Sequence, residues 1–167
     1  MTSQPEAWLR GPVPGVPKEL QPVAHALIQA LEEAEQATNG LSSAHLWTAP
    51  GGAATIGFHL RHMAGALDRL FAYARGEALN DAQRAALRVE ATTTPDVGAE
   101  TLIRELRETI GHALAQLRST PAERLDDERP VGRAQLPSTV RGLLHHAGEH
   151  TVRHAGQMIT TAKVVQG

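Results

Sequence analysis

The residues of this chain most able to do chemistry are histidines. The segment HHAGEHTVRH, residues 145–154, holds four of the nine histidines of a 167-residue chain without cysteine. On a helix, His150 and His154 lie one turn apart on the same apolar face, His146 lies a further turn back, and His145 faces solvent. Two imidazoles at this spacing can reach a single metal ion, although the same spacing also fits a half-buried polar helix end.

A two-histidine site is incomplete, because catalytic metal ions usually hold three protein ligands and keep other positions open. The segment TIGFHLRHMAGALDRLFAYARGE, residues 55–77, offers His59 and His62. Helical periodicity places His59 nearer the middle of the apolar stripe and His62 at its edge. Periodicity alone therefore slightly favours His59 as the third ligand.

Four stretches of helical periodicity must position these histidines. Alternating patterns typical of strands are missing from the sequence, so we expect an all-α protein, a four-helix bundle around a single core. Residues 91–98 interrupt the pattern, and residues 120–137 form a connection longer than most bundle loops. The four predicted helices cover residues 18–40, 55–76, 102–119 and a last segment that begins at Ser138 or Thr139 and includes Ile159.

Length and composition indicate one domain over residues 1–167, with an irregular Pro- and Gly-rich lead over residues 1–16. The formal net charge is -2 and aromatic residues make up 3%, which argues against a nucleic-acid-binding surface. No secretory signal and no apolar run long enough to cross a membrane occur, so we expect a cytoplasmic protein that does not bind membranes.

Several kinds of site can be excluded from the sequence. Without cysteine there are no disulfides, thiolate ligands or cysteine nucleophiles, so any thiol chemistry requires a thiol brought in as a cosubstrate. The motifs Glu-x-x-His, HExxH and GxSxG and the Walker glycine loop are absent, which argues against di-iron bundles, zinc proteases, serine hydrolases and P-loop enzymes.

The segments PGGAATIGFHLRHMAGALDRLFAYARGE and HHAGEHTVRHAGQMITTAK resemble the DinB-like superfamily over roughly residues 17–165. The most specific features are the histidine near the start of the second helix and the HxxxH followed by GQ on the fourth. This resemblance implies a four-helix bundle of up-down-down-up topology. It also places a divalent-metal triad on His62, His150 and His154, with the extra histidines His59 and His146 as orienting partners or alternative ligands.

The resemblance implies a metal-dependent enzyme that acts on a small molecule. Relatives include transferases that activate low-molecular-weight thiols, and hydrolysis fits the same site, so a thiol-dependent S-transferase and a hydrolase both stay open. The alternative is a non-enzymatic metal-binding protein of the stress response or of protein interaction. Zinc, nickel, copper or iron suits an all-imidazole site, and a homodimer is expected. Arg69 and Tyr73 could orient an anionic substrate, and Gln157 could hold a ligand histidine.

Overall fold

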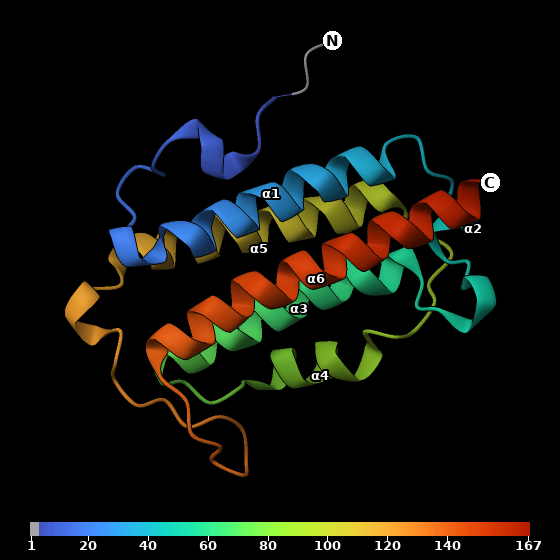
Figure 1. Cartoon of the computed structure of the whole chain (residues 1–167). Coiled ribbons are helices and arrows are strands. Elements are labelled where there is room, and N and C mark those ends of the chain that lie inside the picture. The colour runs from blue at the N-terminus through green and yellow to red at the C-terminus, as the bar shows by residue number, and fades with distance from the viewer. Residues whose placement is uncertain (1–3) are drawn as a thin grey trace.

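The computed structural model describes residues 4–167, whose regular elements are all helices, with no strand among them. Four long helices lie side by side, as Figure 1 shows. The prediction of an all-α protein is therefore confirmed. The long helices are α1 (Gln21–Thr38), α3 (Ile56–Arg75), α5 (Ala99–Ser119) and α6 (Val140–Gln166), and the short ones are α2 (Ser43–Leu46) and α4 (Asp81–Val89).

The long helices share one hydrophobic core. Helix α3 packs against α5 and α6, and α1 packs against the same two helices. Each long helix contributes a leucine without any solvent exposure, namely Leu27, Leu60, Leu106 and Leu144, at the helical spacing that the sequence predicts. Burial of these apolar stripes is the main favourable contribution to the folding free energy.

The two helices that carry the histidine pairs begin at threonine caps. Thr55 Oγ1 accepts a hydrogen bond from the backbone N–H of Phe58 at 3.0 Å, and Thr139 Oγ1 accepts one from Gly142 at 3.0 Å. Each cap satisfies an N–H group that has no partner within the helix. Helix α3 ends at Gly76, whose φ of 81° is a left-handed conformation that favours glycine.

The N-terminal lead, predicted as irregular, contains one short 3₁₀ helix among its described residues, Ala7–Arg10, and a second, Lys18–Leu20, directly precedes α1. Residues 1–3 of the predicted lead lie outside the described part of the chain. The Ala7 N–H donates to Gln29 Oε1 of α1 at 2.8 Å, and Ala7 is itself buried. The lead is thus packed against α1 (Figure 1).

Helix α4 is a second difference from the sequence prediction, which gave no helix between residues 77 and 98. Its start is fixed by a capping box, in which Asn80 and Gln83 exchange hydrogen bonds between side chain and backbone. Helix α4 is amphipathic in sequence, but it is only nine residues long and buries none of its own residues in the core.

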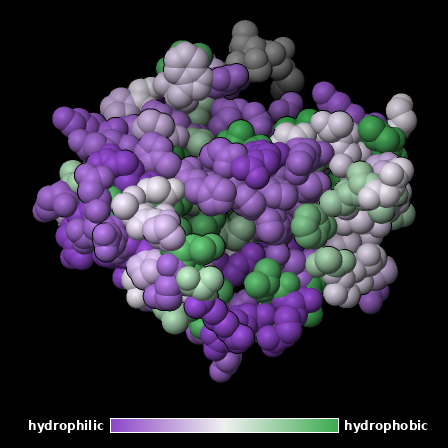
Figure 2. All heavy atoms as spheres, turned by 60° about the horizontal axis from the view of Figure 1, so that its bottom comes forward, coloured by the Kyte–Doolittle hydropathy of each residue, from purple (hydrophilic) through white to green (hydrophobic). Residues whose placement is uncertain are grey.

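The face of the molecule that carries α4 is mixed in polarity. Figure 2 turns this side toward the viewer and shows small apolar patches scattered among polar side chains. Leu87 and Val89 of α4 are among the large apolar residues exposed to solvent. Within the described residues, no helix combines the length and apolar character that a membrane crossing needs.

Candidate metal centre

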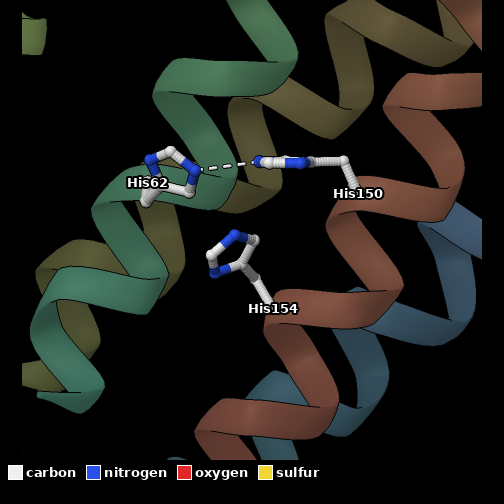
Figure 3. Close-up of side chains that lie close together, drawn as sticks. All are labelled: His62, His150 and His154. Carbon is white, nitrogen blue, oxygen red and sulfur yellow. Dashed lines mark hydrogen bonds between the residues drawn. The ribbon is translucent and has the colours of Figure 1, made fainter. Parts of the chain in front are cut away.

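Three histidines from two helices converge at one point. His62 of α3 and His150 and His154 of α6 each offer a ring nitrogen, and these three atoms all lie within 4.8 Å of one another. Figure 3 shows the three rings turned toward a common centre between the helices. The Nε2 atoms of His62 and His150 are 2.8 Å apart. The structure thus brings together the three residues that the family resemblance selects.

The packing of α6 explains where its two histidines point. Ala147, Thr151 and Ala155 form a buried stripe along α6, and the Thr151 hydroxyl donates to the Ala147 carbonyl oxygen at 2.7 Å. His150 and His154 each precede a member of this stripe by one residue, so they lie about 100° to its side on the helix. Both are therefore half-buried at the edge of the core.

His59, the ligand that periodicity favours, is buried in the core but lies next to the three-histidine cluster. Only 4% of its surface is exposed, as expected from its central place in the apolar stripe. Its Nδ1 atom lies 3.0 Å from Nδ1 of His154, so the two rings share one hydrogen bond. His59 thus contacts His154 from the core side of the cluster.

The other two histidines of the 145–154 segment face outward. His145 is exposed, as predicted from its position on the helix. His146 is exposed as well, with its Nδ1 atom 3.3 Å from Glu149 Oε2, while its ring still lies 5.3 Å from that of His150. His146 is therefore a surface neighbour of the three-histidine cluster.

Phe58 forms an apolar wall beside the three rings. Its ring stacks on His62 with centroids 5.2 Å apart and planes 12° apart, and it meets His154 edge to face at 6.4 Å. An aromatic wall of this kind restricts ring rotation and excludes water from one side of the site. The His62 side chain keeps 20% of its surface exposed, so the site is open on another side.

Burial lowers the pKa of three of the imidazoles at the site, those of His59, His150 and His154. Burial, followed by the neighbouring His154 and His62, lowers the pKa of His150 from 6.5 to about 4. The pKa of His59 falls to about 4 for the same leading reason. Burial and then His62 also lower the pKa of His154. A neutral imidazole is the form that binds a metal ion.

The donor set is one that a divalent ion accepts. Without an ion, one of the facing Nε2 atoms of His62 and His150 donates to the other, whereas a divalent ion would accept a lone pair from each. Among the described residues, Nδ1 of His150 is buried without a hydrogen-bond partner. Three imidazoles whose ring nitrogens converge are ligands that zinc, nickel, copper or iron accept.

One carboxylate contacts the cluster, and sequence analysis did not find it. Glu90, which directly follows α4, is 6% exposed, and its Oε2 atom lies 2.9 Å from Nδ1 of His62. Its Oε1 atom accepts a hydrogen bond from Arg69 of α3 at 2.5 Å. Burial alone would raise the pKa of Glu90, but the hydrogen bonds from His62 and Arg69 outweigh it and hold that pKa below 4.5.

Comparison with known proteins identifies the family. The family model described as the DinB superfamily matches residues 26–158, a range that contains all three histidines and Glu90. The chain belongs to the DinB superfamily. The crystal structure of a conserved protein from Enterococcus faecalis has a similar fold, with a TM-score of 0.73 and 20% sequence identity, over 87% of this chain and 95% of that one. At this identity the likeness supports the fold alone. No curated protein matches the chain.

Three further residues that the sequence suggested for the DinB-superfamily site lie elsewhere. Arg69 does not face an open site, because it is buried in the ion pair with Glu90. Tyr73 lines a different cavity, of about 450 Å³, together with Gly76 and Arg84. Gln157 is exposed on α6.

Proposed function

We propose that this DinB-superfamily chain is a metal-dependent enzyme acting on a small molecule, either as a thiol-dependent S-transferase or as a hydrolase. His62, His150 and His154 would hold the divalent ion. The observation that carries the proposal is the convergence of three partly buried ring nitrogens within 4.8 Å. Three protein ligands leave further coordination positions free, which is typical of catalytic sites and unlike closed structural ones.

When bound, a divalent ion would supply Lewis acidity, which lowers the pKa of a coordinated water or thiol. The chain's own residues prepare the site for this role. The neutral imidazoles of His150 and His154 keep their lone pairs available, and Phe58 excludes water from one side. Because the chain has no cysteine, a thiol nucleophile would have to enter as a separate molecule.

We also propose that the bundle has the up-down-down-up topology expected of the superfamily. The colour gradient of Figure 1 supports this order, since it runs one way along α1 and α6 and the opposite way along α3 and α5. The long connection that such an order requires joins the parallel helices α3 and α5, and it is the segment 76–98 that contains α4.

Metal binding is tested by elemental analysis of the purified protein and its variants. We expect His150→Ala and His154→Ala each to abolish stoichiometric metal binding, because each removes one of three ligands. His145→Ala is the matched control, since His145 lies on the same helix but is exposed. Equal metal content in the wild type and in both ligand variants would refute the site.

Catalysis is tested by incubating the metal-loaded protein with a panel of low-molecular-weight thiols and an electrophile, and separately with ester and amide substrates. Consumption of thiol that is lost in His154→Ala would support the S-transferase. Hydrolysis lost in the same variant would support the hydrolase. Stoichiometric metal without turnover in either assay would overturn the enzyme and leave the non-enzymatic metal-binding protein.

A further inference from the structure

Glu90 joins the metal centre to the segment that contains α4. One carboxylate oxygen, Oε2, contacts Nδ1 of His62 at 2.9 Å, and the other accepts from Arg69. Both partners lie on α3, so a single buried carboxylate bridges two side chains of the same helix. A buried carboxylate is costly unless it is paired and hydrogen-bonded, and here both oxygens have partners.

The local structure holds Glu90 in this position from both sides. Before Glu90 in the sequence, Gln83 of α4 donates to Asp68 of α3 at 2.8 Å. After it, the Thr92 carbonyl oxygen accepts a hydrogen bond from Arg61 of α3 at 2.7 Å. Helix α4 buries none of its own residues, so the main group that this segment brings into the molecule is the Glu90 carboxylate.

Gly65 allows this carboxylate to approach α3. A Cβ atom at position 65 would lie 2.4 Å from Glu90 Oε1 and 2.8 Å from the Arg69 guanidinium. Such distances are far below van der Waals contact, so a larger residue would displace the ion pair. Glycine inside a helix costs about 0.5–1 kcal/mol relative to alanine, and the space for Glu90 is a structural reason for its presence here.

The contact determines which nitrogen of His62 carries the hydrogen. A carboxylate paired with an arginine is ionised and can only accept hydrogen bonds. Nδ1 of His62 must therefore be the donor toward Glu90, which leaves the Nε2 lone pair free. That Nε2 atom is the one that faces His150 in the centre of the cluster.

We propose that Glu90 is the positioning residue of the metal centre, fixing His62 as the Nδ1–H tautomer with its Nε2 lone pair aimed at the ion. Arg69 in turn holds the Glu90 carboxylate in place. This inference rests on the proposed metal site and assigns a role to the α4 segment. Carboxylates that accept from a ligating histidine also raise its basicity and typically strengthen metal binding by about 10- to 100-fold.

The three ligands differ in their second nitrogen. Nδ1 of His154 faces His59, and Nδ1 of His150 has no partner among the described residues. His62 alone of the three has a carboxylate in hydrogen-bond contact in that part of the chain. We therefore expect His62 to be the ligand whose tautomer is most firmly set before the ion binds.

The substitution Glu90→Gln tests the proposal because it reverses the tautomer. The amide oxygen of glutamine must face Arg69, since an arginine can only donate. The amide NH₂ then faces Nδ1 of His62, which must accept and thus moves the hydrogen to Nε2. A protonated Nε2 cannot bind the ion, so zinc titrated into metal-free Glu90→Gln should bind about 10- to 100-fold more weakly than to wild type.

The matched control is Glu77→Gln, which removes the same charge from an exposed carboxylate paired with Arg75. It should leave zinc affinity unchanged. A loss of affinity in Glu90→Gln no larger than in Glu77→Gln would overturn the proposal. The melting temperature of each metal-free variant separates a loss of fold from a loss of ligand orientation.

A second measurement tests the proposal even if Glu90→Gln fails to fold. Long-range ¹⁵N–¹H correlation spectra of the metal-free wild type report the tautomer of His62 directly. The Nδ1–H form supports the proposal, and the Nε2–H form overturns it. Because this readout needs no metal, it is separate from the proposed function, which fails if the wild type binds no stoichiometric metal.

Discussion

The Nδ1 atom of His59 lies 3.0 Å from the Nδ1 atom of His154. Only one of the two nitrogens can carry the hydrogen between them. If His154 binds an ion through Nε2, its Nδ1 carries the hydrogen and His59 accepts. The buried histidine of α3 thus occupies the place where many metal sites have a backbone carbonyl or a carboxylate.

This contact predicts the order of zinc affinity of two alanine variants. His62→Ala removes a ligand, whereas His59→Ala removes a group that orients one, so His62→Ala should weaken zinc affinity more. We expect about 10- to 100-fold weaker binding for His59→Ala and loss of stoichiometric binding for His62→Ala. Calorimetric zinc titration of both, with His145→Ala as control, decides the order. A greater loss in His59→Ala would show that the helical periodicity had identified the ligand.

Much of the fold was predictable because most of its helices bury an apolar stripe. The caps at Thr55 and Thr139 and the stop at Gly76 mark helix ends in the sequence and do so in the structure. Helix α4 was not predicted although its sequence is amphipathic, because its nine residues span too few turns for periodicity alone to mark a helix. Its amphipathic pattern and its capping box, Asn80 with Gln83, are the local signals that could have indicated it.

The site was predictable in part, for a related reason. Spacing alone indicated His150 and His154 as a candidate pair, and it predicted correctly that His59 is buried, but choosing His62 required the family resemblance. Glu90 could not be found from spacing, because its contact with His62 spans 28 positions in sequence and depends on an unpredicted helix. Arg69 was assigned to substrate because its partner was unknown.

A pair of glycine substitutions tests the packing around the start of α3. A Cβ atom at Gly57 would lie 2.4 Å from the ring of Trp47, whose Nε1 donates to the Val97 carbonyl oxygen at 3.0 Å. Gly57→Ala should therefore lower the free energy of unfolding by about 1–3 kcal/mol through overpacking. Gly111→Ala meets no atom within 4 Å and should raise it by about 0.5–1 kcal/mol. Chemical denaturation measures both, and equal effects would argue against the Trp47 contact.

Removal of metal should weaken the fold without unfolding it. An ion present at about 100 times its Kd adds about 2.7 kcal/mol to the free energy of unfolding, or roughly 5–10 °C in melting temperature for a chain of this size. The buried leucines of the four long helices form the core without help from the histidines. Calorimetry with and without chelator measures the change. Complete unfolding on chelation would mean that the site is a structural one.

The metal-free protein should lose stability as the pH falls through the ordinary range of histidine. Burial lowers the pKa of His59 and of His150 from 6.5 to about 4 in the folded state. Between these values the unfolded chain takes up protons that the folded chain does not, so the melting temperature should be highest above about pH 6.5 and decline toward about pH 4. Glu90, whose pKa is held below 4.5, lowers the stability only at more acidic pH, where its carboxylate becomes protonated. The decline between about pH 6.5 and pH 5 therefore reports the protonation of histidines.

The variant His59→Leu, which removes one titrating ring, should show a shallower decline of melting temperature across that interval in the presence of chelator. An unchanged slope in His59→Leu would mean that the buried ring is protonated in the folded protein, and that the hydrogen bond with His154 is formed by a charged donor.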